Sequence, residues 1–195
     1  MWNFLLRVLR ALFRPAMPGD VPEPPPIPPV GQVPTLPKED EILMVLWEAH
    51  NAMRRSGGVQ PLSLSERLNV AAKCHATWMA TNRNMSHSQK TDSEAFFGVT
   101  LSDRLHNVGY PFRSAGENIA AGQRSATQVM TAWLASSGHR ANILNDAYWN
   151  VGFGVARDLY GNLYWCVVFA TPLTSRVIGK EEPVVTTPSA LVFRG

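Results

Sequence analysis

Ser114-Ala-Gly-Glu-Asn-Ile-Ala-Ala-Gly122 is the stretch on which the interpretation of this 195-residue chain depends. It places one carboxylate, Glu117, between a glycine and a short apolar run. Downstream, Trp133-Leu-Ala-Ser-Ser-Gly-His-Arg-Ala-Asn-Ile-Leu144 places one imidazole, His139, directly after a segment with helical periodicity. A second imidazole, His87, precedes Glu117 by 30 residues in a polar segment. We expect these three side chains to meet in one open cleft.

The segments around this stretch carry helix and strand patterns. Helical spacing of apolar residues predicts helices, with a capping box of Ser63 and Glu66 at the start of the second and Gly138 as the end of the fourth. The final strand pattern is apolar on both faces, which indicates a sheet covered on both sides. The expected helices span residues 39–55, about 63–80, 102–107 and 125–135, and the expected strands span residues 151–155 and 163–169.

Residues 1–17 contain no acidic side chain and combine a broad apolar face with Arg7, Arg10 and Arg14. The pattern predicts a short cationic amphipathic helix of about 20 Å, too short to cross a bilayer. The sequence leaves three roles open, namely an interfacial membrane anchor, a helix that docks on a partner protein, and a signal peptide.

Nine of the residues in 18–37 are prolines, which predicts an extended, stiff linker of roughly 60 Å in the polyproline II conformation. Pro25 and Pro28 also match the spacing of a ligand for an SH3-type groove. Residues 38–173 are expected to form the folded domain. Residues 174–195 read as a polar tail or extension.

Charge and cysteine content exclude several classes of protein. A net charge of +3 with no basic stripe interleaved with aromatic residues argues against a nucleic-acid partner. Cys74 and Cys166 lie 92 positions apart, which is neither a metal-binding spacing nor a disulfide scaffold. Two buried thiols and a single long-range disulfide both remain open.

Across residues 38–173 the chain resembles the cysteine-poor, bacterial branch of the CAP superfamily (cysteine-rich secretory proteins, antigen 5 and pathogenesis-related 1), also called SCP domains. The ordered set of matching residues is more specific than any one motif. It comprises Leu46, His50-Asn51, Arg54, Pro61-Leu62, Ala71-Ala72, His75-Ala76, Met79-Ala80, His87, Arg104, Gly109-Tyr110, Gly116-Glu-Asn-Ile-Ala120, Trp133, Gly138-His-Arg-Ala-Asn-Ile-Leu144, Gly152-Phe-Gly154 and the strand from Tyr164-Trp165 to Phe169.

The resemblance implies an α+β fold, an α-β-α sandwich with a small antiparallel sheet between helical layers. It also implies a cleft with two histidines and two acids, of which His87, His139 and Glu117 occupy three positions. The fourth position, three residues after Trp133, is Ser136, so this chain lacks the second acid. Ser136, Asn118 and His75 are expected to line the same cleft.

Two imidazoles and a carboxylate are suitable ligands for a divalent cation, zinc first, with His87, His139 and Glu117 as the candidate ligands. Alternatively, Glu117 could accept a hydrogen bond from an imidazole and fix its tautomer. Without a metal, Glu117 beside His139 should favour the protonated ring and make the cleft sensitive to pH near 6–7.

The resemblance implies a binding role, because no shared reaction defines the superfamily. We therefore expect a non-enzymatic binding module for a lipid or peptide, attached through residues 1–17 to a membrane or a larger assembly. The alternative is a metal-dependent hydrolase of envelope polymers or peptides, with Glu117 as general base. A further route uses Ser136 or Ser137 as nucleophile with His139 as base. The expected location is secreted or envelope-associated, with a virion-associated protein as the alternative.

Overall fold

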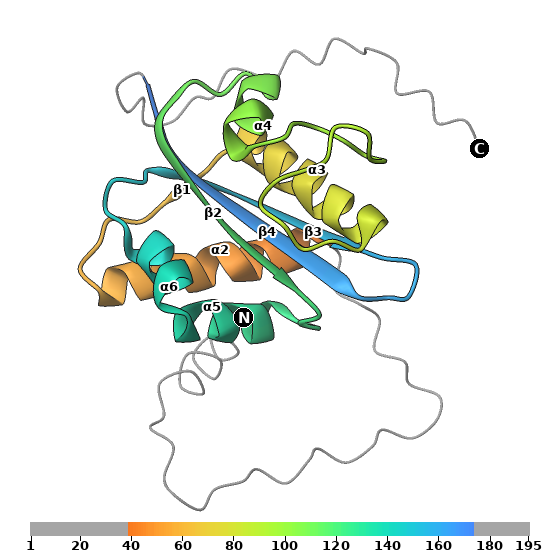
Figure 1. Cartoon of the computed structure of the whole chain (residues 1–195). Helices are drawn as coiled ribbons and strands as arrows, with labels where there is room; N and C mark the ends of the chain where they lie inside the picture. The colour runs from red at the N-terminus through yellow and green to blue at the C-terminus, as the bar shows by residue number, and fades with distance from the viewer. Residues whose placement is uncertain (1–38, 174–195) are drawn as a thin grey trace, which may run out of the picture.

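The structure is a computed structural model, and it describes residues 39–173 (Figure 1). The amphipathic helix expected at residues 1–17, the linker at 18–37 and the tail at 174–195 lie outside the described residues. The helices are α2 (Glu39–Ser56), α3 (Glu66–Asn82), α4 (Leu101–Asn107), α5 (Ala126–Ala135) and α6 (Ser137–Leu144). The strands are β1 (Ser63–Leu64), β2 (Phe112–Ala121), β3 (Asn150–Arg157) and β4 (Leu163–Pro172).

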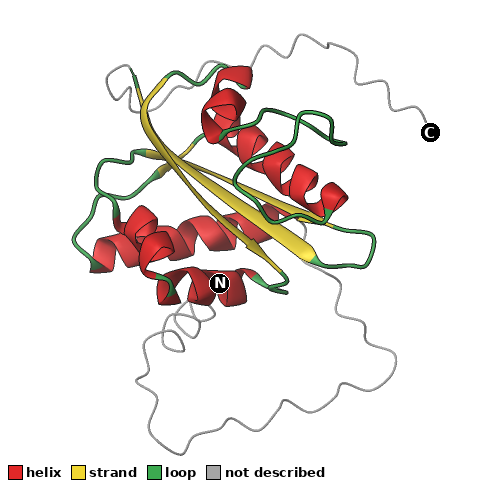
Figure 2. Ribbon diagram, in the orientation of Figure 1, coloured by secondary structure: helices red, strands yellow, loops and turns green. Residues whose placement is uncertain are grey.

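The four strands form one sheet in the order β1-β3-β4-β2. β4 pairs antiparallel with both β3 and β2, as expected, whereas the two-residue β1 pairs parallel with β3 and makes the sheet mixed. Helices cover both faces of the sheet (Figure 2). The expected α-β-α sandwich is therefore confirmed, with α3 and α4 in one layer and α2, α5 and α6 in the other.

Alternation along β4 divides the core into two clusters. Trp165, Val167 and Phe169 pack in the cluster beneath α2, α5 and α6, while Cys166 and Val168 pack in the cluster beneath α3 and α4. All five side chains are at most 1% exposed. Because successive strand residues point to opposite faces, this continuous apolar run explains why both faces of the sheet need a helical layer.

Helix α3 lies unusually close to β3 because two glycines of β3 face it. A Cβ at Gly152 would lie 2.1 Å from the carbonyl carbon of Leu68, and a Cβ at Gly154 would lie 2.4 Å from that of Ala72. Phe153, between the two glycines, points to the opposite core cluster. The Gly-Phe-Gly pattern thus sets the spacing between helix and sheet.

A buried arginine joins α2 to the segment that follows α6. Arg54 is 0% exposed, and its guanidinium donates to the carbonyl oxygens of Ile143, Asn145 and Tyr148 at 2.8–3.2 Å. These bonds satisfy carbonyl groups at and beyond the end of α6, where helical partners run out. They fix α6 against the sheet and so help to position the residues described below.

Three local predictions were wrong. Ser65, not Ser63, caps α3 by accepting from the backbone of Leu68, because residues 63–64 pair with β3 instead of entering the helix. Gly138 does not end a helix, since α5 ends at Ala135 and α6 begins at Ser137. His139 therefore lies in the first turn of α6 and not on a glycine turn. No strand was assigned to residues 112–121, which form β2.

Between Glu39 and Leu173, no helix combines the length and the apolar character that crossing a bilayer requires.

Candidate functional site

Strand β2 places Glu117 and Asn118 on opposite faces of the sheet, because adjacent residues of a strand alternate. Glu117 points into the layer of α3 and α4, where it contacts Arg104 of α4. Asn118 points into the other layer, where its side chain donates to the carbonyl oxygen of His139 at 3.0 Å and accepts from Asn142 at 2.9 Å. Two neighbouring polar residues therefore attach both helical layers to one strand.

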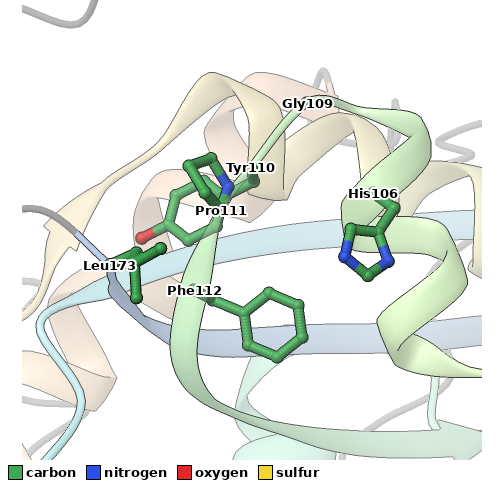
Figure 3. Close-up of a pocket in the computed structure, with 6 residues that line it drawn as sticks. All are labelled: His106, Gly109, Tyr110, Pro111, Phe112 and Leu173. Atoms are coloured by element: carbon green, nitrogen blue, oxygen red, sulfur yellow. The ribbon is translucent and has the colours of Figure 1, made fainter.

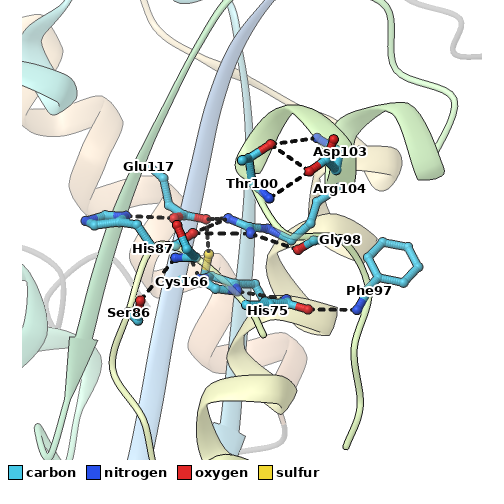
Figure 4. A network of polar contacts seen from close by, with 12 residues as sticks. His75, Ser86, His87, Phe97, Gly98, Thr100, Asp103, Arg104, Glu117 and Cys166 are labelled. Carbon is cyan, nitrogen blue, oxygen red and sulfur yellow. Dashed lines mark hydrogen bonds and ion pairs between the residues drawn. The ribbon is translucent and has the colours of Figure 1, made fainter. Parts of the chain in front are cut away.

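The carboxylate of Glu117 is almost fully enclosed and has a partner on each oxygen (Figure 4). Its side chain is 4% exposed. Oε2 accepts from Nη2 of Arg104 at 2.7 Å, and Oε1 lies 2.8 Å from Nδ1 of His87. The Sγ atom of Cys166 also approaches Oε2, at 3.5 Å. A buried carboxylate with this set of donors is a paired structural charge.

Arg104 also holds the loop that carries His87. Both terminal nitrogens of its guanidinium lie 3.3 Å from the carbonyl oxygen of His87, and the side chain is 0% exposed. Arg104 thus fixes the backbone of His87, while Glu117 fixes its imidazole ring. Arg104 matters for the site, yet the sequence assigned it no role, since spacing does not show that a residue of a polar seven-residue helix will turn inward.

His75 forms the floor of this cluster and is fully buried. Its Nδ1 accepts from the side-chain amide of Gln89 at 2.9 Å, because the amide oxygen of Gln89 is already occupied by the backbone N–H of Phe97. The ring proton then sits on Nε2, which lies 3.7 Å from Oε1 of Glu117. His75 was expected to line the cleft, whereas it lies beneath it, and Gln89 is a member that the sequence did not suggest.

The electrostatics of the cluster follow from burial and pairing. Burial raises the pKa of Glu117, but His87, His75 and Arg104 outweigh it and keep the pKa below its ordinary value. The hydrogen bond to Glu117 raises the pKa of His87. Burial lowers the pKa of His75 to about 4 despite the nearby carboxylate. The cluster therefore holds a carboxylate, a guanidinium and a neutral buried imidazole, with His87 as the imidazole whose pKa is raised.

β2 is an edge strand, and the second layer covers part of that edge. The indole N–H of Trp133 donates to the carbonyl oxygen of Ile119 at 3.2 Å, and Asn142 donates to that of Glu117 at 3.3 Å. Gly116 is required here, since a Cβ would lie 2.4 Å from the hydroxyl oxygen of Tyr148. Side chains of the second layer thus hydrogen-bond backbone carbonyl groups at this edge, which could otherwise pair with another strand.

The structure brings Glu117 and His87 into direct contact and places His139 at the same edge of the sheet. The side chain of His87 is 60% exposed, and His139 is half-buried. Burial, and then the charge of His87, lower the pKa of His139. Ser136 is half-buried at the junction of α5 and α6, and its side chain makes no capping hydrogen bond. The site therefore shows a buried ion pair with His87 bound to its carboxylate, and His139 close enough for the charge of His87 to affect its ring.

The arrangement does not fit the metal centre suggested by the residue types. Among residues 39–173, no group of three or more His, Cys, Asp or Glu side chains is arranged to hold a metal ion. One oxygen of Glu117 is bound to Arg104 and the other to His87, and the side chain is 4% exposed, so both oxygens are already engaged and shielded from solvent. The second alternative, a carboxylate that orients an imidazole, describes the contact with His87. Cys74 and Cys166 are both free thiols.

A separate hollow of about 350 Å³ lies at the far end of β2 (Figure 3). His106, Tyr110, Pro111, Phe112 and Leu173 line it together with a glycine. It shares no residue with the Glu117 cluster, and its lining is mainly apolar.

Comparison with known proteins agrees with this fold. The Cysteine-rich secretory protein family (CAP) matches residues 47–169. An uncharacterized protein of Bacillus subtilis, YkwD, is 35% identical over 107 residues, which are 55% of this chain and 39% of that protein. The chain thus spans well under half the length of this relative.

Two solved structures are similar in fold. An extracellular protein containing a SCP domain from Bacillus anthracis has a TM-score of 0.60 and 28% identity, with 67% of this chain and 40% of that chain covered. An outer surface protein of Borrelia burgdorferi has a TM-score of 0.60 and 24% identity, with 69% of this chain and 94% of that chain covered. With its α-β-α sandwich and the family match over most of its described residues, the chain belongs to the cysteine-rich secretory protein (CAP) family.

Proposed function

We propose that this chain is a secreted or envelope-associated CAP domain that binds peptides at the edge of its sheet and is attached to a membrane through residues 1–17. The similar extracellular SCP-domain protein of Bacillus anthracis supports the location. The observation that carries the binding role is the engagement of both oxygens of Glu117. This pairing makes the carboxylate a fixed support for an exposed imidazole.

A metal-dependent hydrolase would use Glu117 differently. A general base needs a free lone pair within hydrogen-bond reach of a water molecule. Here both oxygens of Glu117 already bond Arg104 and His87, and a side chain that is 4% exposed gives a water molecule little access to them. The geometry therefore favours a preformed polar surface over a catalytic carboxylate.

The surface suits a peptide better than an acyl chain. His87 and His139 present ring N–H and lone-pair groups from the two layers, and these groups can bond the backbone of an extended peptide. The hydroxyl of Ser136 lies close by in sequence at the start of α6. A lipid tail would require an apolar lining instead.

The test uses a random-sequence peptide library selected on the full chain, followed by binding and mass measurements with the enriched peptides. We expect His87→Ala with His139→Ala to weaken binding at least about tenfold, equivalent to about 1.4 kcal/mol. His106→Ala, an exposed histidine outside the site, is the matched control and should bind as the wild type does. Cleavage of the peptides by the wild type but not by the double variant would instead establish a hydrolase. Failure to enrich any peptide would also contradict the proposal.

The tether has its own test. Removing residues 1–17 should release the chain from sedimenting anionic vesicles and leave its melting temperature unchanged. A large fall in melting temperature would show that these residues belong to the domain core.

A further inference from the structure

The turn between β3 and β4 carries the most exposed large apolar side chains of the described domain. Leu159 is 101% exposed and Tyr160 is 73% exposed, and both occupy the turn of the antiparallel β3–β4 hairpin. Neither packs on a core cluster. Adjacent exposed apolar residues that lie outside both core clusters indicate an interaction surface.

The turn is rigid. Asp158 accepts from the backbone N–H groups of Tyr160 and Asn162 at 2.8–2.9 Å, and its second oxygen accepts from the side chain of Asn162 at 2.9 Å. Gly161 has a φ of 87°, the left-handed conformation that glycine adopts without strain. Leu159 and Tyr160 are therefore held outward before any partner binds, which lowers the entropy cost of contact.

The charges presented around the turn are positive. Asp158 is only 8% exposed and is enclosed by the bonds just described. Arg83, at the end of α3, lies 5.4 Å from the centroid of the Tyr160 ring and donates to its hydroxyl at 3.3 Å. Arg157 donates to the carbonyl oxygen of Gly161 at 2.8 Å. Both arginines are exposed. Leucine and tyrosine between arginines form a tip that suits the boundary between anionic headgroups and acyl chains.

The tip lies at the end of the domain where residues 1–38 join it. Glu39, the first described residue, lines one hollow together with Arg157 and Leu163, which flank the turn. Lys73 connects the two, since its ammonium group contacts both Glu39 and the carbonyl oxygen of Val155. Figure 1 shows the start of α2 and the β3–β4 turn at the same end of the sheet. The turn and Glu39, where the described domain begins, therefore lie at the same end of the domain (Figure 1).

We propose that the Leu159–Tyr160 tip is a second membrane contact, which inserts at the surface of an anionic bilayer and orients the tethered domain on it. The inference rests on the proposed membrane attachment through residues 1–17. One interfacial anchor gives only reversible attachment, and a second weak contact on the same chain strengthens it through effective concentration. Two side chains cover far less than the roughly 800 Å² per partner of a stable protein interface, which favours a lipid surface over a protein.

The experiment measures sedimentation of the full chain with vesicles of phosphatidylcholine and phosphatidylglycerol. Leu159→Ser with Tyr160→Ser should weaken binding about tenfold, because the tip no longer buries apolar area. Leu173→Ser removes an exposed leucine at the opposite end of the sheet and should leave binding unchanged. A chain without residues 1–17 should no longer sediment.

A second measurement reports where the tip lies. An environment-sensitive fluorophore on Tyr160→Cys, in a Cys74→Ser background, should shift to the blue with vesicles, while the same label on Leu173→Cys should not. If the tip variant sediments as the wild type does and the label at 160 stays in water, the tip proposal fails while the anchor stands. If the unmodified chain does not sediment, the anchor fails and the tip proposal with it.

Discussion

Replacing Arg104 by methionine tests whether the Glu117 cluster is a scaffold. The guanidinium is fully buried, lies 2.7 Å from the carboxylate and also bonds the backbone of His87. Arg104→Met keeps an apolar chain of similar length but leaves a carboxylate that is 4% exposed without its main counter-charge. Breaking a buried ion pair in this way costs about 3–5 kcal/mol, because the remaining charge stays desolvated.

Two further variants separate the pair from its parts. Glu117→Gln keeps the shape and one hydrogen bond to Arg104 but removes the charge, so we expect a smaller loss of about 2 kcal/mol. Glu117→Gln combined with Arg104→Met removes both charges. The combined change should cost less than the sum of the two single changes, since neither leaves the other unpaired.

Urea unfolding of the full chain near neutral pH, followed by far-ultraviolet circular dichroism, gives these free energies. Arg113→Met, an exposed arginine on β2, is the matched control and should change stability by less than about 0.5 kcal/mol. Losses below about 1 kcal/mol for Arg104→Met, or strict additivity in the double variant, would show that the carboxylate is not held by this pair. The scaffold argument would then be wrong.

Gly152→Ala should destabilise the domain by about 3 kcal/mol in the same urea assay, since its Cβ would lie 2.1 Å from the backbone of Leu68. A Cβ at Gly138 meets nothing within 4 Å, so Gly138→Ala should stabilise α6 by about 0.5 kcal/mol. Burial lowers the pKa of His50 to about 4. The unfolded chain therefore takes up a proton first, and stability should fall by about 1.4 kcal/mol per pH unit as the pH drops from about 6.5 toward 4. Burial also lowers the pKa of His75 to about 4, so the wild type carries a second contribution over the same pH range. His50→Phe should reduce the slope by about 1.4 kcal/mol per pH unit and leave the share of His75, and an unchanged slope would contradict the assignment to His50. The hydrogen bond to Glu117 raises the pKa of His87. The contribution of protonated His87 to stability should be complete below about pH 6.5 and should disappear as the pH rises through the raised pKa. The difference in unfolding free energy between the wild type and His87→Ala measures this contribution at each pH, and a proton NMR titration measures the pKa. A His87 pKa at or below about 6.5 would contradict the hydrogen bond between His87 and Glu117.

Periodicity was enough to locate α2, α3, α4, α5 and the last two strands within a few residues, whereas α6 was not predicted. The apolar spacing of residues 39–55 and the double-sided apolar run of β4 survive in the structure because local pattern and tertiary burial agree there. The wrong predictions lie where the local sequence pattern and the tertiary structure favour different conformations. Ser63 has the sequence of a helix cap, but pairing with Asn150 takes it into the sheet. Gly138 has the sequence of a helix stop, yet it continues into α6 at a negative φ.

The site was only partly predictable, for a different reason. Glu117 and His87 could be named as candidate site residues from the sequence, because one lies beside an apolar run and the other in a polar segment. Arg104, Gln89 and the burial of His75 depend on which way a helix and a loop face after folding, and no short-range pattern records that direction. A carboxylate reads the same in sequence whether it is a free base or an ion-paired support. The distinction appears only when its two oxygens can be assigned donors.

The Gly-Glu-Asn segment decides the fold for a reason that its composition does not suggest. A strand at the edge of a sheet has one open side, and a sandwich needs both helical layers to close over it. Glycine lets Tyr148 approach the strand, glutamate recruits Arg104 and the His87 loop on one face, and asparagine recruits α6 on the other. The positions of His87 and His139 are consequences of this closure, because each belongs to a segment that Glu117 or Asn118 bonds. Binding at this edge would therefore be coupled to the packing of both layers, and a ligand that contacts His87 and His139 together would stabilise the whole sandwich.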